Sequence, residues 1–292
     1  MRDMPDAAIV GDGRMGRALC TELDGGDIRV TAVYSRHKGR PAAGRLTPQA
    51  VSDAETIDAD IILITTQDDE IANAAGSLVS KVVRPSIILH TSGSMSSDIL
   101  ADARAKGFAV GSMHPLVSVT DGESVNDIFR GVYFCVEGDP RAVEAAKLIT
   151  GELGGEVFTI AAEKKALYHA AAVMTSGHTV ALFAAAAEVL AECGLSGETA
   201  REILLPLLSS TAANLERAAP KDAITGPFAR ADIGTVERDL DALIADADAD
   251  AKKLFLILGE RSLRLALERG IDRDAAEKLA DAINIARSRS EC

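Results

Sequence analysis

The side chains best suited to proton transfer lie at residue 114 and in the segment 165–169. Lys165 and His169 are four residues apart, so they would share one face of a helix. His114 precedes Pro115 at the end of an apolar run. Protonation of a developing substrate oxygen needs a positioned acid, and lysine and histidine both qualify. We therefore expect Lys165, or otherwise His114, to be a proton donor. The alternatives are solvated lysines at a helix start and a buried turn histidine.

A second polar group lies within residues 225–232. Arg230 could bind a substrate carboxylate through two parallel hydrogen bonds. Asp232 could orient that guanidinium or cap the next helix, and Thr225 precedes the rigid Gly226-Pro227 turn. We expect Thr225, Arg230 and Asp232 to contribute to a substrate site. A structural arginine–aspartate pair in a loop between helices is the alternative.

Six residues near the N-terminus have the spacing G-x-G-x-x-G: Gly11, Asp12, Gly13, Arg14, Met15 and Gly16. They follow the apolar run Ala7–Val10 and open a helical pattern. Gly11 permits a tight turn, Gly13 lets a pyrophosphate approach the backbone, and Gly16 lets the helix pack against the strand. The free N–H groups and the helix dipole would hold the anion. The motif predicts a dinucleotide site, and an ordinary glycine-rich turn is the alternative.

The end of the second expected strand, Arg29–Tyr34, predicts which dinucleotide binds. Sites that prefer NAD usually place a carboxylate there to accept from the ribose 2′-hydroxyl. This chain has Ser35 and Arg36 instead, with Lys38 and Arg40 close by. A guanidinium and a hydroxyl suit a 2′-phosphate. We therefore predict NADP(H), with a solvated basic loop as the alternative.

Two further turns follow expected strands. In an open α/β sheet, ligands bind beyond the carboxyl ends of the strands, so both turns would face the cofactor. Their small hydroxyl side chains and glycine permit close contact, although turns need such residues in any case. Five residues are expected to contact the cofactor: Thr65, Thr66, Gln67, Ser92 and Gly93.

Seven short apolar runs divide the first half of the chain. Most are continuous, which is typical of parallel strands covered on both faces. The expected strands are Ala7–Val10, Arg29–Tyr34, Ile61–Thr65, Ser86–His90, Ala109–Met113, Val132–Glu137 and Glu156–Ile160. Helical patterns separate several of them, including Met15–Leu23, Ile71–Ser80 and Pro140–Leu153. This order predicts an α/β fold with a doubly wound Rossmann domain over residues 1–160.

From residue 161 onward the patterns are helical, which predicts an all-helical C-terminal domain over residues 161–292. Gly259 predicts a helix break, and Pro220–Thr235 predicts a loop. Glu163–Cys193 fits either one long helix or a pair. The remaining expected helices are Glu198–Ala218, Arg238–Leu258, Arg261–Arg269 and Asp274–Arg289.

The composition limits the partners and the location. A formal net charge of −13 argues against nucleic acid and anionic lipid as general partners. The four cysteines lack metal-ligand spacing, so we expect no metal site and a reducing compartment. The apolar stretch Ala170–Leu190 is interrupted by polar residues, which favours a buried helix over a membrane span. Without a secretory pattern at the N-terminus, we expect a cytoplasmic location.

The motifs occur in an order that resembles a known family. They are Gly11-x-Gly13-Arg14-Met15-Gly16, His90-x-Ser92-Gly93-Ser94, Gly111-x-x-His114-Pro115, Lys165-x-x-Tyr168-His169 and Thr225-Gly226-Pro227-Phe228-Ala229-Arg230-x-Asp232. Together they resemble the Rossmann-like oxidoreductases of the 6-phosphogluconate-dehydrogenase-like superfamily. The resemblance implies an NADP domain, a helical domain that forms a homodimer, and an active site between them. Members of that family include alternative ketopantoate reductases, with pyrroline-5-carboxylate reductases as distant relatives.

These features predict an NADPH-dependent oxidoreductase that reduces a small anionic 2-oxo acid, with ketopantoate as the best single substrate. Lys165 or His114 would protonate the oxygen, and Arg230 would hold the carboxylate. An imine reductase of the pyrroline-5-carboxylate type is one alternative, because an iminium needs no strong acid. A non-catalytic NADP-binding regulator is another, favoured by Gly177 where the family usually has asparagine.

Overall fold

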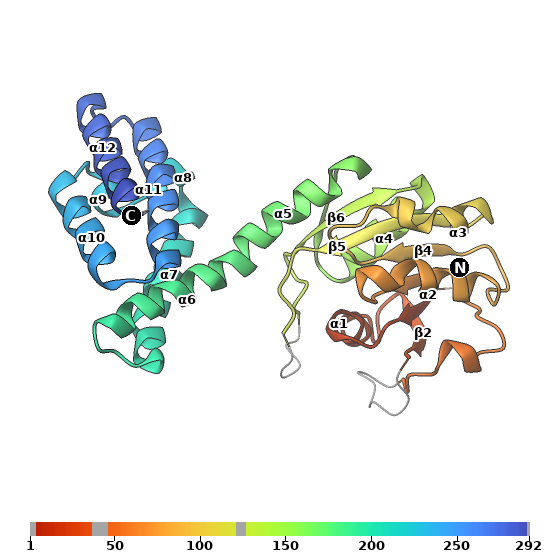
Figure 1. Ribbon diagram of the computed structural model, residues 1–292. Coiled ribbons are helices and arrows are strands. Elements are labelled where there is room, and N and C mark those ends of the chain that lie inside the picture. The colour runs from red at the N-terminus through yellow and green to blue at the C-terminus, as the bar shows by residue number, and fades with distance from the viewer. Residues whose placement is uncertain (1–3, 37–45, 121–126, 291–292) are drawn as a thin grey trace. The chain divides into compact units, whose positions relative to one another are not determined.

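The computed structural model describes residues 4–36, 46–120 and 127–290 (Figure 1). The chain divides into two compact units, Met1–Ser176 and Gly177–Cys292. The predicted domain boundary at residue 160 precedes this division by one helix, because that helix begins with Lys165, which is buried in the first unit.

The first unit contains a seven-stranded sheet in the order β2-β1-β3-β4-β5-β6-β7. All neighbouring strands are parallel except β5 and β6. The strands are β1 (Asp6–Val10), β2 (Arg29–Tyr34), β3 (Ile61–Ile64), β4 (Ile87–His90), β5 (Ala109–Pro115), β6 (Tyr133–Gly138) and β7 (Glu156–Thr159). Each expected strand is therefore present. His114 lies inside β5, one residue beyond the expected strand end.

Helices cover both faces of this sheet, as the prediction of a doubly wound α/β fold requires. One buried cluster contains residues of α1 (Arg14–Glu22) and α4 (Pro140–Glu152). The other contains residues of α2 (Ile71–Val79) and α3 (Ala101–Ala105). The 3-10 turns η2 (Asp68–Glu70) and η3 (Ser97–Leu100) follow the carboxyl ends of β3 and β4, and η1 (Val51–Asp53) precedes β3. The strand ends and these turns position the candidate site.

A helix pair follows β7 and the turn η4 (Ala162–Lys164). α5 (Lys165–Thr175) and α6 (Gly177–Glu192) are separated at Ser176, whose ψ of −80° departs from helical geometry. Of the two expectations for residues 163–193, the structure therefore has the pair. α5 belongs to the first unit and α6 to the second.

The second unit is helical throughout its described residues. Its helices are α6, α7 (Gly197–Arg217), α8 (Pro220–Ala223), α9 (Gly226–Ala229), α10 (Ile233–Asp246), α11 (Ala249–Arg269) and α12 (Arg273–Ser290). Side-chain caps start four of them, because Ser196, Asp232, Asp248 and Asp272 each accept a hydrogen bond from a first-turn N–H. Its buried core comes from α9 to α12, with Phe228, Leu256 and Leu279 among its members.

The structure corrects two expectations for this unit. Helix α11 runs through Gly259, and the chain breaks instead between α10 and α11 at Ala247 and Asp248. A Cβ on Gly259 would lie 3.1 Å from the Phe228 ring, so the glycine makes room for this ring and does not end the helix. The expected loop 220–235 holds the short helices α8 and α9 as well as the first turn of α10.

The apolar stretch Ala170–Leu190 is not the buried helix that the sequence predicted. Within the described residues, the helical stretch Ala162–Glu192 is long and apolar enough to cross a membrane by length and composition alone. None of its most apolar window is buried. Helices α6 and α7 contribute no residue to the buried core of α9 to α12.

Candidate active site

The glycine motif forms the turn between β1 and α1. Gly11 has φ of 118°, which favours glycine, and its N–H donates to the Tyr34 carbonyl at 2.8 Å. Gly13 is the N-cap residue of α1, and no atom lies within 4 Å of the position of its missing Cβ. Gly16 is buried, and a Cβ there would collide with the Gly11 carbonyl oxygen. The turn thus leaves an open cradle at Gly13, as a pyrophosphate site requires.

A cavity of about 670 Å³ lies beside this turn. Gly11, Gly13, Ser35 and Arg36 line it from β1 and β2, and Thr65, Thr66 and Gln67 line it from β3. Val10, Asp12 and Tyr34 complete the wall at the first two strands. The remaining lining residues were not expected to contact a cofactor: Ala50, Val51, Ser52, Glu70, Asn73, Ala74 and Ser77. The structure therefore brings together the predicted cofactor residues of three strand ends.

Five predicted cofactor residues do not line this cavity: Arg14, Met15, Gly16, Ser92 and Gly93. Arg14 is exposed at the start of α1, and Met15 packs against the first unit's core. Thr65 lines the cavity, but its hydroxyl donates to the Gly11 carbonyl at 2.8 Å. That bond ties the end of β3 to the glycine turn.

Two buried oxygens in the cavity wall have no hydrogen-bond partner among the described residues. One is Thr66 Oγ1, a hydroxyl that a bound ribose or phosphate could satisfy. The other is Asp12 Oδ2, whose negative charge opposes a pyrophosphate. The open glycine cradle and the unpaired hydroxyl fit a dinucleotide, whereas Asp12 weakens the attraction for its phosphates.

The end of the cavity near β2 holds an ion pair. Arg36 Nη1 lies 3.0 Å from Glu70 Oε1, and the arginine side chain is 68% exposed. Ser35 is buried, and its N–H donates to the Gln49 carbonyl at 2.8 Å. The guanidinium of Arg36, which the sequence predicts to bind a 2′-phosphate, is therefore already paired with the carboxylate of Glu70. Lys38 and Arg40 lie outside the described residues.

Lys165 is the centre of a second polar group, at the carboxyl ends of β4 and β5. It is 1% exposed, and its Nζ donates to the Ser92 carbonyl at 3.0 Å and to Ser112 Oγ at 2.9 Å. Nζ also lies 5.5 Å from the centre of the Tyr168 ring, within cation–π range. The alternative of a solvated lysine is therefore wrong for Lys165.

Three aromatic side chains surround this lysine. The His114 Nδ1 lies 2.7 Å from the Tyr168 hydroxyl, and the His114 and His169 ring centres are 6.0 Å apart. A Cβ on Gly93 would lie 2.8 Å from His114 Nε2, so this glycine lets the β4 turn approach the histidines. Lys165, His114, His169, Ser92 and Gly93, predicted from separate segments, thus form one cluster.

Burial sets the charge states of this cluster. It lowers the pKa of His114 to about 4, with the Lys165 charge adding to the effect, so His114 is neutral near pH 7. It raises the pKa of the Tyr168 hydroxyl, which stays protonated. Burial also lowers the pKa of Lys165, and the negative charges of Glu137 and Asp68 oppose that change, as that of Cys135 would if it were a thiolate. A lysine with lowered pKa can give up a proton more readily than an exposed one.

The other three predicted substrate residues belong to the second unit. Asp232 caps α10, accepting from the Thr235 N–H at 3.1 Å and from its hydroxyl at 2.9 Å. These bonds lower the pKa of Asp232. Of its two expected roles, the structure therefore has the helix cap. Arg230 is exposed directly after α9, and Thr225 is exposed directly before it.

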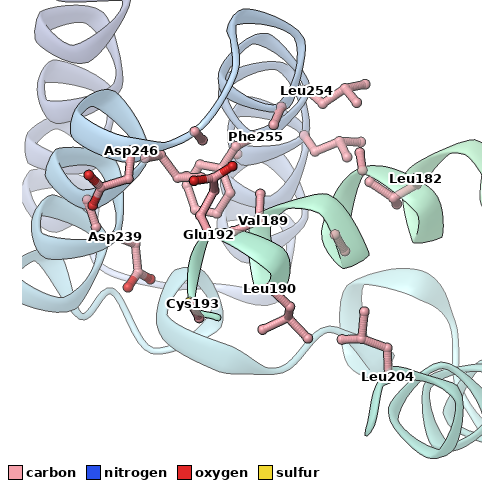
Figure 2. Close-up of a pocket in the computed structure, with 18 of the residues that line it drawn as sticks. Leu182, Val189, Leu190, Glu192, Cys193, Leu204, Asp239, Asp246, Leu254 and Phe255 are labelled. Atoms are coloured by element: carbon pink, nitrogen blue, oxygen red, sulfur yellow. The ribbon is translucent and has the colours of Figure 1, made fainter. Parts of the chain in front are cut away.

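The second unit also contains an apolar cavity of about 620 Å³ (Figure 2). Leu182, Val189 and Leu190 of α6 line it, opposite Leu254 and Phe255 of α11. Three carboxylates stand among its lining residues: Glu192, Asp239 and Asp246. The sequence analysis did not predict this cavity.

Sequence reasoning missed several polar residues of the first unit. Ser112 and Glu137 are cross-strand partners on β5 and β6. They are far apart in the sequence, so no local pattern indicates that they pair. Glu70 was missed because η2 is an acidic turn that reads as solvated. The alternation of Ser112, Met113 and His114 on β5 was a usable signal, since it places the serine and the histidine on one face.

Comparisons with known proteins agree with this architecture. A Rossmann-like domain model matches residues 4–115, and a model described as a domain of unknown function, DUF2520, matches residues 132–262. No curated protein matches the chain. Among solved structures, a Bacteroides fragilis protein described as a candidate NADP oxidoreductase is 22% identical with a TM-score of 0.70, covering 90% of this chain and 98% of its own.

Two more distant structures also share the fold. A Plasmodium falciparum pyrroline carboxylate reductase with NADP bound is 12% identical with a TM-score of 0.57, covering 99% of both chains. An Aspergillus terreus reductive aminase in complex with NADPH and ethyl levulinate is 14% identical with a TM-score of 0.54, covering 98% of this chain and 94% of its own.

The fold and the two matched models define the class: a Rossmann-like domain followed by a helical C-terminal domain. More particularly, residues 4–115 match the Rossmann-like model and residues 132–262 match the DUF2520 model, and the solved structures share the fold.

Proposed function

We propose that this protein is an NADPH-dependent reductase of a small 2-oxo acid that works in the cytoplasm, with ketopantoate as the first substrate to test. The observation that carries the proposal is Lys165, a buried amine held by Ser92 and Ser112 beside His114 at the carboxyl ends of the strands. The solved structures that share this fold include proteins described with NADP or NADPH, which supports the choice of cofactor.

The residues of the cavity would hold NADPH in a defined way. The Gly11–Gly16 turn and the start of α1 would bind the pyrophosphate, Arg36 and Ser35 the 2′-phosphate, and the Thr66 hydroxyl a neighbouring ribose or phosphate oxygen. When bound, NADPH supplies a hydride to the substrate carbon. Lys165 would give its proton to the substrate oxygen. His114 would share a hydrogen bond with the Tyr168 hydroxyl and, being neutral, would not repel the Lys165 ammonium.

A second candidate is an imine reductase. The shared fold of the pyrroline carboxylate reductase and of the reductive aminase favours it. An iminium arrives already protonated, so Lys165 would then tune the local charge and would not transfer a proton.

A substrate panel tests the proposal. We expect NADPH oxidation with 2-oxo acids, ketopantoate among them, and little with cyclic imines such as pyrroline-5-carboxylate. Turnover restricted to imines would select the second candidate. Tight NADPH binding in calorimetry without oxidation across the panel would select the non-catalytic regulator.

We further propose that the second unit pairs with a second copy of itself. Several apolar side chains of α6 and α7 are exposed, namely Val180, Leu182, Ile203, Leu205, Leu207 and Leu215. The same unit carries the apolar cavity lined by α6 and α11. An apolar helix and an apolar cavity on one unit are the complementary parts that a twofold interface needs.

Light scattering after gel filtration tests this pairing. We expect a dimer that Leu207→Glu converts to monomer, because a charge at 62% exposed Leu207 would be buried in the interface. The matched control, Glu202→Gln on the same helix, should stay dimeric. A monomeric wild type would contradict the proposal, and cosedimentation with lipid vesicles would point to a membrane as the partner of these helices.

A further inference from the structure

The described part of the chain buries one carboxylate and one ammonium. Among the described residues, Glu137 and Lys165 are the charged acid and base that count as buried, at 6% and 1% exposed. Neither has an ion-pair partner within the described residues, whose salt bridges lie at more exposed side chains. A buried charge without a partner is costly, so the surroundings of these two groups need an explanation.

The sheet places the two groups close together. Glu137 on β6 pairs with Ser112 on β5, and cross-strand partners point to the same face of a sheet. Ser112 Oγ is itself a hydrogen-bond acceptor of Lys165 Nζ at 2.9 Å. One serine therefore separates the carboxylate from the amine.

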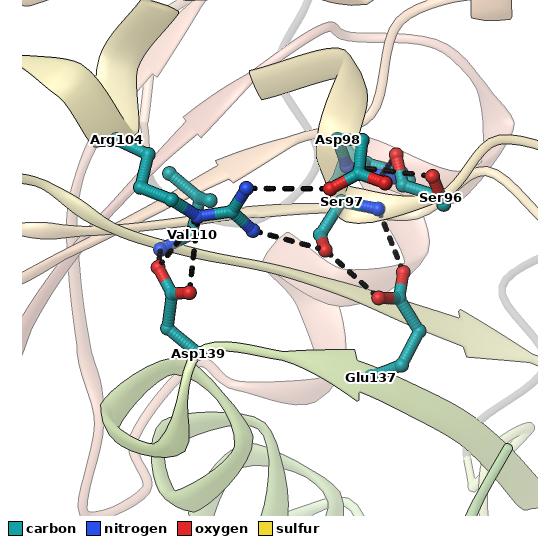
Figure 3. Close-up of polar contacts among 8 residues, drawn as sticks. Ser96, Ser97, Asp98, Arg104, Val110, Glu137 and Asp139 are labelled. Atoms are coloured by element: carbon teal, nitrogen blue, oxygen red, sulfur yellow. Dashed lines mark hydrogen bonds and ion pairs between the residues drawn. The ribbon is translucent and has the colours of Figure 1, made fainter. Parts of the chain in front are cut away.

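The carboxylate is held in place by a turn (Figure 3). Glu137 Oε1 accepts from the Ser97 N–H at 2.7 Å, and Oε2 accepts from the Ser97 hydroxyl at 2.8 Å. The nearby cation, Arg104, donates to Asp139 at 3.0 Å and pairs with Asp98 at 3.3 Å. Arg104 also donates to the Ser97 hydroxyl at 3.4 Å, but its ion pairs within the described residues are with Asp98 and Asp139, which leaves the charge of Glu137 available to Lys165.

The same turn is connected to the lysine through buried hydrogen bonds. The Ser96 carbonyl lies 3.2 Å from His90 Nε2, and the Ser92 N–H donates to His90 Nδ1 at 3.2 Å. Because Nδ1 accepts, Nε2 carries the proton and donates to Ser96. The Ser92 carbonyl then accepts from Lys165. Glu137 is therefore anchored to the turn that presents a Lys165 acceptor.

We propose that Glu137 is a positioning residue for Lys165: its buried carboxylate fixes the Ser96–Ser97 turn and keeps the Lys165 side chain an ammonium at neutral pH. This rests on the proposed role of Lys165 as the proton donor. The titratable groups around Lys165 are His90 on β4, His114 on β5, Cys135 and Glu137 on β6, Tyr168 and His169 on α5, and Asp68 on η2.

The charges of these groups leave Glu137 as a main source of stabilisation. Burial lowers the pKa of both His90 and His114 to about 4, so both are neutral near pH 7. Burial raises the pKa of Cys135 and of Tyr168, so both stay protonated. Asp68 remains as the other carboxylate, and its Oδ2 already accepts from the Ser94 hydroxyl at 2.6 Å.

A direct titration of Lys165 tests the proposal. We would follow the Lys165 side-chain nitrogen by NMR in full-length protein labelled at lysine, assigned with Lys165→Met. We expect a wild-type midpoint above pH 7. Glu137→Gln keeps an acceptor for the Ser97 N–H but removes the charge, so its midpoint should fall by about one pH unit. The alkaline limb of the pH profile of kcat/KM should fall equally.

Two further variants separate charge from anchoring. Glu137→Asp keeps the charge at a shorter reach, so the midpoint should stay near wild type even if thermal stability falls. Glu156→Gln removes an exposed charge from β7 and should move nothing. An unchanged Lys165 midpoint in Glu137→Gln, or an equal fall of that midpoint in Glu137→Asp, would overturn the proposal. A wild-type midpoint below pH 7 would also overturn it, and this measurement does not depend on any variant being folded.

The titration also separates this inference from the proposed function. If Lys165→Met retains full turnover, the lysine is not the proton donor, and a fall of the midpoint in Glu137→Gln still establishes the coupling of the two buried charges. If Lys165→Met loses turnover but the Lys165 midpoint is unchanged in Glu137→Gln, Lys165 remains the proposed proton donor and the positioning role of Glu137 is wrong.

Discussion

Lys165→Met is expected to lower kcat about 10²- to 10⁴-fold while leaving the affinity for NADPH nearly unchanged. The variant removes the proton donor and keeps an unbranched side chain of similar length. Lys165 lies in the β4–β5 cluster and not among the lining residues of the cavity that would hold the cofactor. Steady-state kinetics with the substrate found by the panel, together with calorimetric titration of NADPH, measure both quantities.

The fold should survive this substitution. The Ser92 carbonyl loses the lysine but still accepts from the Ser112 hydroxyl at 3.2 Å, so no buried carbonyl is left unpaired. The buried Glu137 carboxylate loses the nearby ammonium, however, so we expect a folded variant with a lower Tm. Lys164→Met changes an exposed neighbour and should keep wild-type kinetics. Full activity of Lys165→Met would remove the lysine from the mechanism.

Arg36→Ala is expected to weaken NADPH binding about 10- to 100-fold with little change in NADH affinity. The guanidinium would make a charge-assisted hydrogen bond to the 2′-phosphate, which is worth about 1.5–3 kcal/mol. Because Arg36 is largely exposed, solvent screening favours the lower end of this range. Dissociation constants for both cofactors at fixed ionic strength measure the effect, and equal losses for NADPH and NADH would contradict the assignment.

Removing the charge of Glu70 is expected to have the opposite effect on NADPH affinity. It pairs with Arg36 at 3.0 Å and would lie near the bound phosphate, so NADPH has to compete with this carboxylate for the guanidinium. Glu70→Gln should tighten NADPH binding about two- to fivefold, and this gain should vanish in the Arg36→Ala background. Asp69→Asn, a loss of the same charge from the same turn, is the control. An unchanged NADPH affinity in Glu70→Gln would mean that the ion pair has no influence on cofactor binding.

The local patterns predicted the first unit well, because a parallel sheet imposes them on the sequence. Continuous apolar runs such as Ile61–Ile64 have to be buried on both faces, and Gly11 and Gly16 are required by a turn and a close approach that no other residue permits. In the second unit the same approach failed at Gly259. A glycine inside a helix and a glycine at its end look alike in the sequence, and the contact with Phe228 distinguishes them.

The sequence by itself determined the order of strands and helices in the first unit and the glycine cradle between β1 and α1. It also identified 165–169 as the segment that carries the candidate proton donor. These depend on spacing along the chain, which backbone geometry converts directly into structure. Tertiary structure alone decided that Arg36 pairs with Glu70 and that Glu137 lies across the sheet from Ser112, beside Lys165. Both pairings join residues far apart in the sequence, and strand register and burial, which no local pattern records, set the charge of the lysine.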